Sequence, residues 1–104
     1  MRKNILIQSK AIGRFIGTRA SASSIREEAE LMLARGIGAE VVFDFTDIEV
    51  TQSFVDELIG QLILRQGPDV LNRLVFKSCS EDVRSVIEFV ANDRCDQYIK
   101  QNSH

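Results

Sequence analysis

Histidine is nearly absent from this 104-residue chain, because its one histidine, His104, is also the last residue. Chain ends are usually frayed, so catalysis in which histidine serves as the base for a serine or cysteine nucleophile has no histidine inside the fold. Tryptophan is absent and Tyr98 is the one tyrosine, which leaves few aromatic rings on which nucleic-acid bases could stack. These shortages predict a chain without catalytic residues.

Cysteine is also scarce: Cys79 and Cys95 are the only two, and they form no CxxC pair. Two cysteines without an internal histidine are too few for a Cys/His zinc site. The simplest interpretation is two free, partly buried thiols, and we prefer it to a redox pair. We therefore predict neither a metal nor another cofactor.

The chain has no excess of charge and no long apolar run. It holds 13 Lys and Arg against 15 Asp and Glu, a net charge of −2, which leaves no basic surplus for the phosphates of a nucleic acid. No apolar run reaches the roughly 18–20 residues of a membrane span, and the segment after Met1 is too short for the apolar core of a signal peptide. The length suits one domain over residues 1–104. We expect a cytoplasmic protein that binds neither membranes nor nucleic acids.

The apolar residues that are present follow the order strand, strand, helix, strand, helix, strand, helix. A helix between two strands implies a parallel pair, and the two adjacent strands at the start imply an antiparallel hairpin. These rules predict an α/β fold with a mixed sheet of about four strands covered by helices. The nearly continuous apolar character of residues 40–45 predicts a strand covered on both faces. The other predicted strands are residues 4–8, 14–16 and 73–77.

Polar residues mark where the helices begin and end. Ser24 and Glu27 have the spacing of a capping box at the start of the first helix. Either Thr51 or Ser53 caps the second helix. The third helix opens at residues 80–82, and the polar segment from Ala91 onward is either its frayed extension or a further short helix.

Five carboxylates crowd the junction between the strand at 40–45 and the next helix: Asp44, Asp47, Glu49, Asp56 and Glu57. A metal-dependent nuclease needs carboxylates that converge on an ion, usually beside a lysine, yet no lysine lies between Lys10 and Lys77. The preferred interpretation is therefore a set of solvated charges. A small nucleotide- or metal-binding enzyme that uses Arg19 and the acidic cluster near Asp44 is the alternative function.

Thr18 and Arg19 form a second candidate site, for an anion. They belong to a Ser-rich segment before the first helix, where a guanidinium and free helix N–H groups can hold a phosphate, a nucleotide or the carboxylate of a partner. The competing interpretation, which we prefer, is a loop arginine paired with a surface acid.

Ser53 also has two interpretations. As a helix cap, its oxygen would accept a backbone N–H and contribute about 1 kcal/mol. As a phosphoacceptor, it would gain about −1.5 to −2 charge, which is favourable at a helix N-terminus but is repelled by Asp56 and Glu57 one turn later. The pattern alone favours capping.

The segment from Val41 to Leu58 resembles the signature of a STAS-like family of unknown function, which is related to the STAS domains of anti-sigma factor antagonists. The core of the signature is Ser-Phe-x-Asp-Glu-Leu, here residues 53–58. Similar motifs are Gly-Thr-Arg at residues 17–19 and the start of the last helix at residues 81–84. The resemblance covers roughly residues 13 to 90 and implies the STAS arrangement, a mixed sheet with helices.

In the anti-sigma factor antagonists, which are bacterial signalling proteins, the corresponding serine is phosphorylated by a histidine-kinase-like ATPase, and the phosphate breaks the complex. Ser53 falls at the matching position, although Gln52 replaces the usual Asp and the bulky Phe54 follows. The resemblance therefore implies a non-enzymatic regulatory module that docks on such an ATPase or another signalling protein, with Ser53 as phosphoacceptor. The implied docking surface consists of Thr51, Gln52, Ser53, Phe54, Asp56 and Glu57. A homodimer built through a strand edge or the last helix is a third hypothesis.

Overall fold

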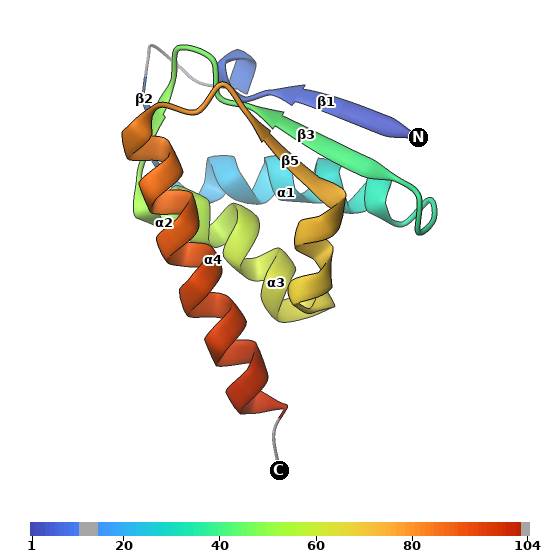
Figure 1. The fold of residues 1–104 in the computed structure, drawn as a ribbon. Coiled ribbons are helices and arrows are strands. Elements are labelled where there is room, and N and C mark those ends of the chain that lie inside the picture. Colours follow the sequence, from blue (N-terminus) through green and yellow to red (C-terminus); the bar gives the residue numbers. More distant parts are fainter. Residues whose placement is uncertain (11–14, 103–104) are drawn as a thin grey trace.

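The centre of the fold is a small parallel sheet. The computed structural model describes residues 1–10 and 15–102, and its sheet has the strand order β1 (Arg2–Leu6), β3 (Glu40–Asp44), β5 (Leu74–Lys77). β1 and β5 both run parallel to β3 (Figure 1). Two shorter strands, β2 (Phe15–Ile16) and β4 (Glu49–Val50), form a separate parallel pair. The predicted α/β class is confirmed, with three strands in the main sheet instead of about four.

The predicted antiparallel hairpin at the start of the chain is wrong. β1 pairs with β3, and β2 pairs with β4, both across long stretches of sequence. The reason lies in the segment after β1, which turns at once into the 3₁₀ helix η1 (Ile7–Lys10) with Ile7 fully buried. A hairpin needs a tight turn directly between its two strands, and a helical segment follows β1 instead.

The helices cover one face of the sheet (Figure 1). They are α1 (Arg19–Leu33), the consecutive segments α2 (Gln52–Val55), η2 (Asp56–Gly60) and α3 (Gln61–Gln66), the 3₁₀ helix η3 (Pro68–Arg73), and α4 (Glu81–Gln101). The segment η2 is a single π-helical turn inside an otherwise continuous helix, and we call residues 52–66 the central helix. None of the helices within the described ranges has the length and apolar character of a membrane span.

The core lies between the sheet and the helices. Val41 and Phe43 of β3 point into it, and the Phe43 ring stacks on Phe76 with centroids 6.0 Å apart. Each fully buried side chain of this size contributes about 1.5–3 kcal/mol. Val42, between these two inward-facing residues, points to the opposite face and is also buried, in register between Asn4 and Val75. β3 is therefore buried on both faces, as predicted, although the helices lie along one face of the sheet (Figure 1).

The helix ends follow the capping rules, with one change of residue. Thr18, not Ser24, caps α1, and its Oγ1 accepts a hydrogen bond from the backbone N–H of Ser21 at 3.1 Å. Ser24 lies on an exposed position inside the helix. Ser80 caps α4 as predicted, with its Oγ 3.1 Å from the backbone nitrogen of Val83. α4 is one helix to Gln101; its second half is polar because it extends beyond the body of the molecule (Figure 1).

Candidate functional site

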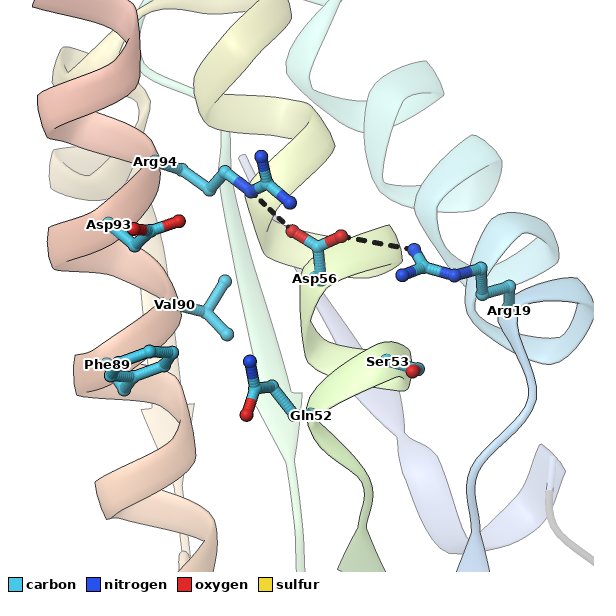
Figure 2. A pocket seen from close by; sticks show the side chains of 8 residues that line it. All are labelled: Arg19, Gln52, Ser53, Asp56, Phe89, Val90, Asp93 and Arg94. Atoms are coloured by element: carbon cyan, nitrogen blue, oxygen red, sulfur yellow. Dashed lines mark hydrogen bonds and ion pairs between the residues drawn. The ribbon is translucent and has the colours of Figure 1, made fainter.

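A polar pocket lies where the start of α1, the start of the central helix and the middle of α4 meet (Figure 2). Its volume is about 300 Å³. Three of its lining residues, Gln52, Ser53 and Asp56, belong to the predicted docking surface, and Arg19 belongs to the predicted anion site. The lining is completed by Phe89, Val90, Asp93 and Arg94 of α4. We call this the Ser53 pocket.

Thr51 holds the central helix in position beside α1. Its Oγ1 accepts the backbone N–H of Phe54 at 3.1 Å, which is the cap of the helix, and donates to the carbonyl oxygen of Gly17 at 2.8 Å. Of the two capping alternatives, Thr51 is therefore the correct one. Ser53 is exposed, and its hydroxyl makes no hydrogen bond with any residue of the described ranges.

Asp56 connects three helices through one carboxylate. Its side chain is 9% exposed, and its Oδ1 accepts from Nε of Arg94 at 2.6 Å while its Oδ2 accepts from Nη1 of Arg19 at 3.1 Å (Figure 2). Burial alone would raise the pKa of Asp56, but the hydrogen bonds from Arg94 and Arg19 outweigh it, and the pKa lies below its usual value. The hydrogen bond to Asp56 likewise raises the pKa of Arg94. The carboxylate is therefore ionised at neutral pH and fully engaged.

Gly60 makes room for this connection. A Cβ atom at Gly60 would lie 2.5 Å from Oδ1 of Asp56 and 3.2 Å from Cγ of Arg94. The π-helical turn begins at Asp56 and ends at Gly60, and such turns widen a helix by one residue. The local backbone and the glycine thus place the carboxylate between the two arginines.

Two members of the predicted docking surface face elsewhere. Phe54 is fully buried in the core, so a partner cannot contact it, and its place on that surface is a correction. The apolar stripe that forms the helix turns Phe54 inward beside Leu58. Glu57 is engaged by Arg26, whose Nη1 donates to both its carboxylate and its carbonyl oxygen. Thr51 is the half-buried helix cap, so the exposed members of the predicted docking surface are Gln52 and Ser53, with Asp56 beneath them.

The predicted anion site is partly reinterpreted by the structure. Thr18 is a helix cap, and Arg19 is the first residue of α1 rather than a loop residue. Arg19 pairs with an acid, as the preferred interpretation held, but this acid is the buried Asp56 and not a surface group. Arg19 still keeps 54% of its side chain exposed and lines the Ser53 pocket.

The five carboxylates predicted as a cluster separate in the structure. Asp44 accepts hydrogen bonds from the hydroxyl and the backbone N–H of Thr46, and these lower its pKa. Asp47 and Glu49 line a different hollow, next to Ser80, which donates to Glu49. Within residues 1–10 and 15–102, no three His, Cys, Asp or Glu side chains come close enough to hold a metal ion.

Both cysteines are free and partly buried, as predicted. Burial raises the pKa of Cys79 and of Cys95 above the usual value for a thiol. A raised pKa disfavours the thiolate form, which is the reactive form of a cysteine.

The α4 side of the pocket was missed at the level of sequence. Phe89 lies within the predicted third helix but was not assigned to a site, and Asp93 and Arg94 lie in the segment predicted as either a frayed extension or a further short helix. The signal was present, because Arg94 follows the inward-facing Val90 by four residues and so shares its face of a continuing helix. Gly60 gave no signal, because its neighbour Arg94 is distant in the chain.

Comparison with known proteins identifies a family for this chain. A family model described as a STAS-like domain of unknown function (DUF4325) matches residues 21–84, more than half of the chain. The match includes Ser53, Asp56 and Gly60, whereas Arg19 precedes it and Arg94 follows it. A search of curated proteins and a search of solved structures each found no match.

Proposed function

Because the chain belongs to the family of STAS-like domains of unknown function, we propose that it is a non-catalytic regulatory module that binds a protein partner through Ser53 and the pocket beside it. The observation that carries the proposal is the difference between Ser53 and its neighbours. Thr51 caps the helix and Phe54 fills the core, whereas Ser53 is exposed and its hydroxyl bonds to no described residue. A residue of this kind is free to serve an intermolecular contact.

The partner we propose is a histidine-kinase-like ATPase, because the STAS-like family is related to the anti-sigma factor antagonists and Ser53 falls at the position of their phosphorylated serine. Phosphorylation of Ser53 would then control the contact. The repulsion expected from Asp56 and Glu57 is reduced, because Arg19 and Arg94 engage Asp56 and Arg26 engages Glu57. A phosphate of about −1.5 to −2 charge on Ser53 would therefore be tolerated beside a half-exposed arginine.

Site-directed photo-crosslinking in cells of the source organism tests this proposal. One chain carries benzoylphenylalanine in place of the exposed Gln52, and a control chain carries it in place of Ile37, which is 93% exposed and lies outside the pocket. We expect a crosslinked ATPase of the histidine-kinase type, identified by mass spectrometry, from position 52 and not from position 37. Equal products from both positions, or none from position 52, would contradict the proposal.

The charge at Ser53 is then tested with the identified partner. We expect Ser53→Glu to weaken binding at least fivefold, about 1 kcal/mol, and Ser53→Ala to leave it unchanged. Ser24→Glu is the matched control, because it adds the same charge at an exposed helical position outside the pocket. If Ser53→Glu bound as well as the native protein, Ser53 would not be a switch.

A further inference from the structure

Phe89 is an exposed aromatic side chain at the edge of the Ser53 pocket. It is 57% exposed and is the only aromatic residue that is exposed among those whose side chains the structure describes. It cannot turn inward, because Val83, Ile87 and Val90 already occupy the buried face of α4. Aromatic residues, phenylalanine included, are enriched in protein interfaces relative to the rest of the surface.

The polar lining of the same pocket has spare hydrogen-bond donors. A guanidinium carries five N–H groups, and Arg19 uses one nitrogen, Nη1, for Asp56. Both oxygens of Asp56 are engaged and the side chain is 9% exposed, so it offers little to an incoming group. The hydroxyl of Ser53 and the amide of Gln52 add further donors.

The charges of the pocket are arranged unevenly. Figure 2 shows Arg19 on the α1 side and Asp93 on the α4 side, with Asp56 between them. Arg94 also faces the pocket, but it donates to Asp56 and to Gln97. An incoming carboxylate would therefore find free donors on the α1 side, away from Asp93.

We infer that Arg19 and Phe89 together recognise an acidic segment of the partner, in which a carboxylate binds Arg19 and a nearby apolar side chain packs on Phe89. This inference deepens the proposed protein-binding role and rests on it. A guanidinium binds a carboxylate through two parallel hydrogen bonds, which gives direction as well as affinity. A phosphate on Ser53 would compete for the same guanidinium, since both residues line one pocket.

Selection from a random peptide library tests the inference without a known partner. The full chain is the bait, and the double variant Arg19→Ala/Phe89→Ser is the counter-selection bait. We expect enriched peptides to carry Asp or Glu within a few positions of an aromatic or large aliphatic residue. Peptides enriched without an acidic residue, or bound equally by the counter-selection bait, would overturn the inference.

Matched single variants then assign the two contacts with the enriched peptide. We expect Arg19→Ala and Phe89→Ser each to weaken binding at least tenfold. The control for Arg19 is Arg65→Ala, because Arg65 is equally exposed, at 54%, and is also ion-paired. The control for Phe89 is Ile99→Ser, on the same helix and also 57% exposed. Controls that weaken binding as much as the test variants would overturn the inference.

A polar variant without charge covers the case in which Arg19→Ala disturbs the fold. Selection with Arg19→Gln, whose amide can still donate to Asp56, should lose the enrichment of acidic peptides, with the fold verified by circular dichroism. If it continued to enrich acidic peptides, Arg19 would not be the recognition group. This failure differs from failure of the proposed function, because crosslinking from position 52 to an ATPase would still be observed.

Discussion

Substitution of Gly60 by alanine tests the central connection of the site. In an ordinary helix this change raises the free energy of unfolding by about 1 kcal/mol, because alanine loses less backbone entropy on folding than glycine does. Here the new Cβ would lie 2.5 Å from Oδ1 of Asp56, a separation that real side chains do not adopt. The carboxylate must move, and it is held by Arg94 and Arg19.

The net effect follows from these opposing contributions. Overpacking of this kind costs about 1–3 kcal/mol, and a disturbed hydrogen bond to a charged group costs about 1.5–3 kcal/mol. After the gain of about 1 kcal/mol in helix propensity is subtracted, we expect Gly60→Ala to lower the free energy of unfolding by about 1.5–5 kcal/mol. Urea denaturation followed by circular dichroism at 222 nm measures it, and for a domain of this size a 1 kcal/mol loss lowers the Tm by about 4–8 °C.

The same substitution in a chain that lacks the Asp56 carboxylate tests whether this carboxylate causes the loss of stability. With Asp56→Ala already present, the Oδ1 atom at 2.5 Å is gone. The close atom that remains is Cγ of Arg94 at 3.2 Å, in a flexible side chain that the carboxylate no longer holds, so Gly60→Ala should stabilise the fold by up to about 1 kcal/mol. Gly38→Ala is the control, because a Cβ there meets nothing within 4 Å. If Gly60→Ala did not destabilise the chain that retains Asp56, or destabilised both backgrounds equally, the carboxylate would not be what the glycine accommodates.

Two further predictions concern pH and capping. The pKa of Asp56 in the folded state lies below the unfolded value of 3.8. The ionised carboxylate therefore contributes fully to the stability of the fold above that value, and this contribution is lost as the pH falls through the folded pKa. The free energy of unfolding should therefore drop more steeply below about pH 4 in the native chain than in Asp56→Asn; parallel curves in urea titrations at stepped pH would contradict this. Thr51→Ala should destabilise by about 1–2 kcal/mol, through loss of the cap and of the bond to Gly17, whereas Ser53→Ala should change stability by less than about 0.5 kcal/mol. Equal effects of the two substitutions in the same denaturation assay would show that both hydroxyls are structural.

What sequence alone could predict here was largely local. The apolar run at residues 40–45 and the stripe along residues 54–63 depend on nearest neighbours and on helical periodicity, and both elements formed as expected. Strand pairing is not local. The first two strands were therefore predicted to pair with each other, whereas each pairs with a strand that is distant in the sequence. The contact of Asp56 with Arg94 spans 38 residues, and no pattern within either helix signals it. The burial of Phe54, in contrast, was available from the stripe to which it belongs.

The division of roles within residues 53–58 shows where function must be sought. Phe54 and Leu58 fill the core, Asp56 joins three helices and Glu57 is held by Arg26, so these positions of the motif are explained by folding. A family match through this motif is therefore evidence for the fold before it is evidence for a function. Ser53 is the one polar member for which the described structure provides no internal partner. Arg19 and Phe89, which we infer to recognise the partner, lie outside the segment that the family model matches, so the match itself carries no evidence about which protein is bound.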